Sequence, residues 1–409
     1  MYNTCTLPCG LRIIHLPLMS QVVYCGYAIN AGTRDESTGE EGIAHFCEHL
    51  SFKGTDRRRA IHIINSLERV GGELNAFTSK EHTVFYAALQ KEHFPRAVDL
   101  LTDIVFHSTY PQFEVDREVE VVCDEIESYN DSPAELIYDE FEDIVFRGHP
   151  LGHNILGEAE QLRTYTSGTA KGFTSRNYLP QNIVFFVYGD LDFTRLAKML
   201  QRSLSDFPPS VPDSLRHKQS ERLSAYIPEE IIHERNTHQA HVMMGYRAFD
   251  MYDDRRIALY LINNILGGPG MNARLNLSLR ERRGLVYTVE SNVICYSDTG
   301  LWSTYFGCAP KDINRCRRLV LNELRRIAEK PLSPAALSVA KRQMKGQIAI
   351  ANDNREGFAL NFAKVFLHTG RERDVDALFS QIDAVSGEDI MRTASSLFVP
   401  DNITTLVFM

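Results

Sequence analysis

Long apolar runs are absent from this sequence of 409 residues. Its longest apolar stretches, such as residues 183–188, have the length of a buried strand and fall far short of the roughly 20 residues that cross a bilayer as a helix. The first residues also lack the basic start and apolar core of a signal peptide. We therefore expect a cytoplasmic protein with no membrane partner, although a chain trimmed of an export signal would have the same sequence.

Cysteines are few and follow no disulfide framework. The eight that are present are scattered, and two of them, Cys25 and Cys123, lie within apolar runs. Reduced thiols in a cytosolic protein are the simplest interpretation of this pattern.

A broad basic stripe is also missing. The formal net charge is −9, and residues 57–59 form the only dense cationic triplet, which we expect to cap or solvate the end of a helix. This charge balance argues against nucleic acid as the main partner. A net acidic surface would modestly favour basic peptides.

The length and composition indicate a globular protein with more than one core. A chain of 409 residues is expected to form two or more domains, and 44% hydrophobic with 24% charged residues argues against widespread disorder. The proline-rich stretch 207–214 is typical of a linker. We predict an N-terminal half at 1–212, a linker at 213–222 and a C-terminal half at 223–409.

Each half has the pattern of an α+β fold, and a short repeat indicates a duplication. Amphipathic helical segments are mixed with strands such as Thr83–Leu89 and Thr288–Cys295. Segment 178–185 has a counterpart at 398–405, and each joins the end of a helix, a proline and an apolar strand. Chance recurrence of so short a pattern is the alternative.

The most informative motif is H-x-x-E-H, formed by His45, Glu48 and His49. Residues four apart on an α-helix lie on one face, so both imidazoles can reach one metal ion. Glu48 projects from a neighbouring part of that face, within reach of a water on the metal. Nitrogen ligands with a carboxylate suit Zn²⁺ better than Mg²⁺ or Ca²⁺. The order of residues is the inverzincin signature.

The residues around this motif support a helix. The polar and acidic stretch 37–41 suits a helix N-terminus, and the stretch 53–55 interrupts the pattern where the helix should end. Cys47 projects to a different side from the two histidines and is predicted to be a small buried residue.

A catalytic zinc site needs a third protein ligand. The best candidate region is the acidic segment 116–127, in which apolar residues recur at helical spacing. Glu118 and Glu125 lie seven residues apart on one face of that helix, so one can bind the metal while the other orients a ligand or a substrate group. Spacing alone does not decide between these two and other nearby acids. For most of the carboxylates, a solvated helix face is the simpler interpretation.

With these features the chain resembles the pitrilysin, insulysin and mitochondrial processing peptidase family of zinc metalloendopeptidases. The family's third ligand lies 76 residues after the second histidine, at Glu125 here, and its accompanying glutamate falls on Glu118. Further blocks match in the family's order at 71–79, 149–152, 267–270 and 279–287. The resemblance spans nearly the whole chain and implies two homologous α+β halves that enclose a chamber, with one Zn²⁺ per chain.

The reaction that the resemblance implies is hydrolysis of peptide bonds. Zn²⁺ held by His45, His49 and Glu125 would lower the pKa of a bound water toward neutrality and polarise the peptide carbonyl. Glu48 would accept the proton of the water and pass it to the leaving amine, so it is predicted to be the general base rather than a ligand.

The resemblance also implies groups that bind the substrate. Asn75, Ala76 and Phe77 match the family's edge strand beside the metal, to which an extended peptide adds as a further strand. Arg280 and Tyr287 match residues of the C-terminal half that reach the substrate or the tetrahedral intermediate. The alternatives are a plain strand and a surface ion pair of the arginine.

Specificity and assembly follow from the same resemblance. Glu135 and Asp139 stand ten and fourteen residues after Glu125, where processing enzymes carry acids that contact arginine near the cleavage point. We therefore predict a preference for basic peptides, with a solvated helix face as the alternative. The shorter, processing-peptidase-like members pair two subunits, so we expect a homodimer, or a heterodimer with a similar chain.

Two rival functions stay open at this point. A non-catalytic or partner-dependent subunit of a heterodimeric processing-peptidase-like complex would share the fold, but such relatives characteristically lose metal ligands. Here His45, Glu48, His49 and Glu125 are all present. A structural zinc site would be closed by a fourth Cys or His ligand, and none is evident in the sequence.

Overall fold

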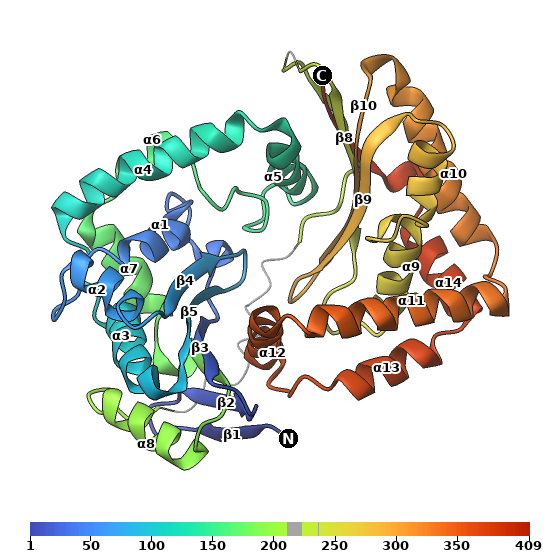
Figure 1. Ribbon diagram of the computed structural model, residues 1–409. Helices are drawn as coiled ribbons and strands as arrows, with labels where there is room; N and C mark the ends of the chain where they lie inside the picture. The colour runs from blue at the N-terminus through green and yellow to red at the C-terminus, as the bar shows by residue number, and fades with distance from the viewer. Residues whose placement is uncertain (211–222, 236) are drawn as a thin grey trace. The chain divides into compact units, whose positions relative to one another are not determined.

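Two β-sheets with matching strand orders form the framework of this protein, one in each of two units (Figure 1). The computed structural model describes residues 1–210, 223–235 and 237–409. Within these, the first unit takes Met1–Ser128, 153–210 and Ala351–Arg373, and the second takes Tyr129–Gly152, 223–350 and Asp374–Met409. The predicted linker at 213–222 lies outside the described residues.

The first sheet has six strands in the order β1-β2-β6-β3-β5-β4. Strand β6 runs parallel to β2, and the other neighbours are antiparallel. The strands are β1 (Asn3–Thr6), β2 (Arg12–Leu16), β3 (Val22–Ile29), β4 (Glu73–Thr78), β5 (Thr83–Gln90) and β6 (Ile183–Tyr188).

Both faces of this sheet are covered by helices, as the apolar run of β6 requires. Ile183, Phe185 and Val187 of β6 face a core that includes the helices of one layer, whereas Val184 and Phe186 pack in a second core with α12 (Arg355–Thr369). The helices that contribute to the first core are α1 (Ile43–Leu50), α2 (Ala60–Glu68), α3 (Phe94–Phe106), α4 (Gln112–Asn130), α6 (Ala159–Leu162), α7 (Ser167–Asn177) and α8 (Phe193–Ser203).

The cationic triplet 57–59 lies at the start of α2, as expected, with Arg59 at the N-cap position and Arg57 and Arg59 exposed to solvent. Arg58 forms ion pairs with Asp99 and Asp103 of α3, the second with 2.5 Å between Nη1 and Oδ2. The aspartate side chain of this second pair is fully buried. Arg58 therefore links the segment before α2 to α3, a role that the sequence did not predict.

The second sheet has five strands in the order β7-β11-β8-β10-β9. Strand β11 is parallel to β7, and the other neighbours are antiparallel. The strands are β7 (Glu230–His233), β8 (Ala240–Ala248), β9 (Val286–Cys295), β10 (Gly300–Cys308) and β11 (Thr404–Phe408).

One face of this second sheet carries a layer of helices, and the other face is covered by α5 (Pro133–Val145). Ile137 and Phe141 of α5 pack with Met243 of β8 and Leu406 of β11. The helices on the first face are α9 (Arg256–Gly267), α10 (Ile313–Glu329), α11 (Pro334–Asn352), α13 (Val375–Ala384) and α14 (Gly387–Leu397).

The two sheets correspond strand by strand, apart from the additional β1. Strands β2, β6, β3, β5 and β4 match β7, β11, β8, β10 and β9, including the single parallel pair. A short 3₁₀ turn precedes each parallel strand, at Pro180–Asn182 and at Pro400–Asn402. The predicted α+β class is confirmed, and the repeat between 178–185 and 398–405 reflects equivalent strands.

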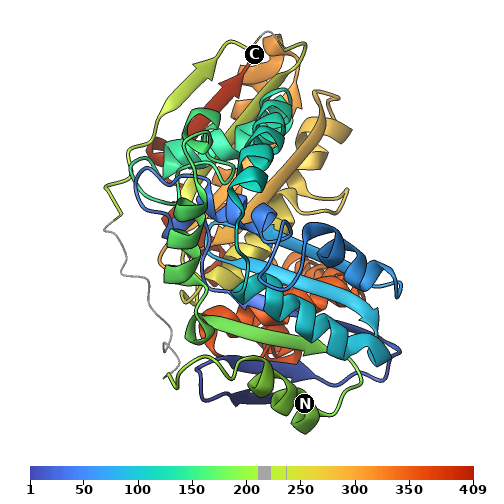
Figure 2. The same ribbon diagram turned by 90° about the vertical axis from the view of Figure 1, so that its left-hand side faces the viewer.

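In each sheet, the helix that covers one of the two faces comes from the other half of the sequence. Helix α5 belongs to the second unit although it lies at 133–145, and α12 belongs to the first unit although it lies at 355–369. Helix α12 contacts β3 and β6 of the first sheet, and in Figure 2 these blue and green strands lie next to an orange-red helix from near the end of the chain. The compact units therefore differ from the predicted halves at 129–152 and 351–373.

No described helix has both the length and the apolar character that a membrane crossing demands. All eight cysteines are free thiols, and Cys47 is fully buried in the first core, as predicted.

Candidate metal centre

Helix α1 presents the two histidines of the motif side by side. His45 and His49 lie one turn apart on this helix, with ring centroids separated by 4.6 Å. The helix begins after Gly42, whose φ of 90° is a left-handed conformation that favours glycine. A Cβ at this position would lie 2.6 Å from the carbonyl oxygen of Leu156, so the close approach also requires glycine.

The cap of α1 comes from Glu36, which the sequence did not indicate. Its carboxylate accepts hydrogen bonds from the backbone N–H groups of Gly42 at 3.0 Å and Ala44 at 2.8 Å, and it lies 2.7 Å from Nε2 of His153. The Glu36 side chain is completely buried, and this burial raises its pKa even though the three hydrogen bonds act against the rise. The stretch 37–41 therefore precedes the helix but does not supply this cap.

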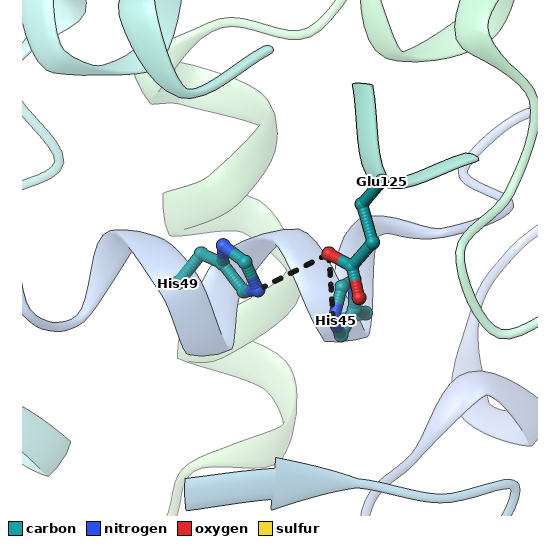
Figure 3. A group of neighbouring side chains, drawn as sticks. All are labelled: His45, His49 and Glu125. Carbon is teal, nitrogen blue, oxygen red and sulfur yellow. Dashed lines mark ion pairs between the residues drawn. The ribbon is translucent and has the colours of Figure 1, made fainter. Parts of the chain in front are cut away.

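Three ligand atoms of the predicted site converge (Figure 3). Oε2 of Glu125, from α4, lies 3.7 Å from Nε2 of His49 and 4.0 Å from Nε2 of His45. Four ligands about 2.1 Å from a zinc ion would be about 3.4 Å apart in a tetrahedron, so this spacing fits one ion with a small contraction. Within the described part of the chain, this is the one such group of His, Cys, Asp or Glu side chains.

The chemistry of the donors also fits Zn²⁺. Burial, with a contribution from His49, lowers the pKa of His45 to about 3, so its imidazole is neutral and can donate a lone pair. The side chain of Glu125 is 35% exposed and that of His49 is 25% exposed. Two imidazoles and a carboxylate with access from solvent are typical of catalytic zinc sites, which keep a position for water.

Glu118 supports the group from behind His49. Oε1 of Glu118 lies 3.0 Å from Nδ1 of His49, and its Oε2 lies 2.5 Å from Nζ of Lys53. A proton on Nδ1 would leave Nε2 of His49 as the lone-pair donor toward Glu125. Burial acts to raise the pKa of Glu118, but the hydrogen bonds from His49 and Lys53 lower it overall, so this carboxylate is ionised.

Glu48 lies on the same helix but is not a member of the ligand group. Glu48 is 8% exposed as a residue, and its Oε2 accepts a hydrogen bond of 2.6 Å from the hydroxyl of Thr78. Burial raises the pKa of Glu48, and the hydrogen bond from Thr78 opposes the rise. A carboxylate with a raised pKa is a better proton acceptor, which suits the predicted general base.

Strand β4 borders this centre and is an edge strand. It pairs with β5 along its length and forms the end of the first sheet, with Asn75 opposite Tyr86 and Ala76 opposite Phe85. Helix α1 packs against β4. The predicted substrate residues Asn75, Ala76 and Phe77 therefore lie on a free sheet edge next to the helix that carries the histidines.

The remaining predicted residues belong to the second unit. Arg280 lies on a π-helix, Asn276–Glu281, and its guanidinium carbon is 5.6 Å from the ring centroid of Tyr287, whose side chain is 79% exposed. Glu135 is exposed and Asp139 half-buried on α5. The structure groups Arg280 with Tyr287, and the roles of all four residues stay predictions.

The helix of the second unit that corresponds to α1 carries no metal ligands. Helix α9 follows β8 as α1 follows β3, and its sequence, residues 256–267, contains no histidine, cysteine, aspartate or glutamate. Among the described residues, the group of metal ligands therefore lies in the first half alone. The fold and the site together define a class of proteins with two matching α+β halves, in which the first half carries the metal ligands of a peptidase.

Comparisons with known proteins identify the family. Residues 17–159 match the model "Insulinase (Peptidase family M16)", and residues 165–344 match "Peptidase M16 inactive domain". The uncharacterized zinc protease YmxG of Bacillus subtilis is 30% identical over 97% of this chain and 96% of its own length. An uncharacterized zinc protease of Streptomyces coelicolor is 31% identical over 95% of this chain and 85% of its own. The chain belongs to peptidase family M16, as its resemblance to the insulysin group predicted.

Solved structures share the fold over the whole chain. A protease from Helicobacter pylori superposes with a TM-score of 0.89 at 20% identity, covering 100% of this chain and 99% of that one. A structure titled as a peptidase M16 inactive domain from Pseudomonas fluorescens gives 0.91 at 18% identity, with coverages of 100% and 97%.

Proposed function

We propose that this protein is a zinc-dependent metalloendopeptidase that hydrolyses extended peptides or unfolded segments. The convergence of His45, His49 and Glu125 is the observation that carries the proposal. Their N, N, O donor set and partial exposure suit a catalytic ion better than a closed structural one. When bound there, Zn²⁺ supplies a Lewis acid and makes a water nucleophilic at neutral pH.

The side chains around the centre divide the work between them. Glu48 accepts the proton of the attacking water and returns it to the leaving amine. Glu118 fixes the ring orientation of His49 through Nδ1, and Lys53 holds Glu118 in its ionised form. The cap from Glu36 anchors the first turn of α1, which carries His45.

Substrate binding is proposed to use the edge of β4. Main-chain groups at 75–77 would pair with an extended peptide, and the small side chain of Ala76 allows a close approach. Arg280 and Tyr287 would bind the substrate or the tetrahedral intermediate, and Glu135 and Asp139 would favour arginine near the cleaved bond. We further propose a homodimer, with a heterodimer as the alternative assembly.

Zinc analysis and peptide cleavage on the purified full-length protein test this function together. We expect about one zinc per chain, cleavage of a quenched basic peptide and loss of cleavage with a chelator. Glu48→Gln should keep the zinc and reduce kcat by about 10²–10⁴-fold, because a positioned general base contributes on that order. Glu120→Gln, on the exposed side of α4, serves as the control and should keep full activity.

The outcomes separate the rival functions. Zinc binding with cleavage only after addition of a similar chain would indicate a partner-dependent subunit. Zinc binding without cleavage under either condition would indicate a structural site and contradict the proposal. The same assay with peptides that lack arginine tests the preference for basic peptides, and equal cleavage rates would rule it out. Light scattering measures the oligomeric state.

A further inference from the structure

The single hydrogen bond to the Glu48 carboxylate comes from the strand proposed to bind the substrate. Thr78 is the last residue of β4, and its Oγ1 donates to Oε2 of Glu48 at 2.6 Å. Oε1 of Glu48 has no hydrogen-bond partner among the described residues. One hydroxyl therefore determines which carboxylate oxygen is held and which stays available.

The neighbouring hydroxyl cannot take over this role. Oγ1 of Thr83 lies 3.5 Å from Oγ1 of Thr78, but it donates its proton to the carbonyl oxygen of Ala31 at 2.9 Å. A hydroxyl has one proton to donate. The proton of Thr78 is thus free for Glu48, and its β-branched side chain restricts χ1 to few rotamers, so the donor is held in place.

Strand β4 connects this hydrogen bond with the sheet edge. Asn75, Ala76 and Phe77 directly precede Thr78 on the same strand, and the register of β4 against β5 places Thr78 opposite Thr83. Helix α1, which carries Glu48, packs against β4. A peptide paired with the free edge of β4 would bind to the strand whose end holds the Glu48 carboxylate.

We propose that Thr78 is a positioning residue for the proposed hydrolysis, fixing the orientation of Glu48 relative to a peptide bound along β4. This proposal rests on the proposed function, in which Glu48 is the general base. Thr78 acts through Glu48 and needs no contact with substrate or metal to do so.

Two substitutions at one position separate the hydroxyl from the rest of the side chain. Thr78→Val keeps the shape and removes the donor, whereas Thr78→Ser keeps the donor and removes a methyl group. We expect Thr78→Val to lower kcat about 10- to 100-fold, the range for one hydrogen bond to a charged group, with KM changed by less than about threefold. Thr78→Ser should restore kcat to within about threefold of wild type, and zinc content should be equal in all three proteins.

Thr83→Val is the matched control, because it removes the next hydroxyl, which does not donate to Glu48. It should leave kcat within about threefold. Equal losses in Thr78→Val and Thr83→Val, or in Thr78→Val and Thr78→Ser, would show a general disturbance of the strand and overturn the proposal. A kcat of Thr78→Val within about twofold of wild type would do the same.

Crystal structures of the wild type and the two Thr78 variants give a readout that needs no activity. Glu48 should adopt another rotamer or several in Thr78→Val and keep one rotamer in Thr78→Ser. An unchanged Glu48 rotamer in Thr78→Val overturns the positioning role. Absence of chelator-sensitive cleavage by the wild type would instead refute the proposed function, while the rotamers would still decide whether Thr78 orients Glu48.

Discussion

Replacing Glu118 with glutamine should weaken zinc binding without removing any ligand atom. The carboxylate is 5% exposed and takes hydrogen bonds from His49 and Lys53 on its two oxygens. Glutamine offers one acceptor oxygen and one NH₂ group, so one of these two bonds is lost and the remaining one loses its ionised acceptor.

The magnitude can be reached by two routes. Loss of a group that orients a metal-binding histidine costs about 10- to 100-fold in metal affinity. One hydrogen bond to a charged group is worth about 1.5–3 kcal/mol, which at about 1.4 kcal/mol per decade is again about 10- to 100-fold. We therefore expect the Kd of Glu118→Gln for zinc to rise by about that factor.

Competition against a chromophoric chelator at neutral pH measures this Kd. Glu120→Gln is the matched control on the same helix, because its side chain is 66% exposed and reaches Arg163 only at 3.6 Å. An exposed pair of this kind contributes little, so its zinc Kd should change by less than about twofold. Wild-type affinity in Glu118→Gln, or an equal loss in both variants, would refute the supporting role of Glu118.

Two further predictions concern stability. Glu36→Gln should lower the free energy of unfolding by about 1–3 kcal/mol, because the new NH₂ group cannot accept a hydrogen bond from the N–H group of Gly42 or Ala44. Urea unfolding measures this change. The control Glu41→Gln, at an exposed carboxylate, should change the free energy of unfolding by less than about 0.5 kcal/mol. In α14, hydrogen bonds from the side chain and backbone of Ser386, together with Arg392, lower the pKa of Asp389 from 3.8 to about 2. The ionised Asp389 therefore stabilises the folded protein above about pH 4, and this contribution is lost as the pH falls toward 2. Asp389→Asn should thus be less stable than wild type by up to about 1 kcal/mol at pH 7 and equal to it near pH 2, and a difference independent of pH in thermal unfolding would contradict this.

The local part of the site could be predicted from the sequence. His45, Glu48 and His49 share one short helix, so their spacing alone fixes which of them point together. Glu118 and Glu125 could not be separated in this way, because both lie on the same side of α4. The structure distinguishes them by which imidazole nitrogen each one faces, Nδ1 or Nε2 of His49, and this depends on how α4 packs against α1.

The polar contacts that support the site could not be predicted from the sequence pattern. Glu36 and His153 are 117 positions apart, and Thr78 is 30 positions from Glu48. Such contacts are made once and follow no period, so neither hydrophobic spacing nor capping rules can find them. The acidic stretch 37–41 looked like the start of the helix because its composition is right, whereas the carboxylate that caps α1 comes just before it.

The exchange of α5 and α12 was equally hidden. A hydrophobic period tells that a helix has a buried face but not which sheet it covers, and connections within one half are the simpler expectation. Phe362 and Phe366 of α12 pack on the first sheet, although more than 170 positions separate them from its last strand, β6.

The same exchange bears on how such a chain can be divided or rebuilt. Cutting the chain between the halves would expose one apolar face of each sheet, because the helix that packs on that face would belong to the other fragment. Neither fragment is therefore expected to fold as an independent domain. Transferring one half into another protein would require the helix that covers its sheet to be transferred as well. Each half therefore depends on a helix of the other half to cover the second face of its sheet.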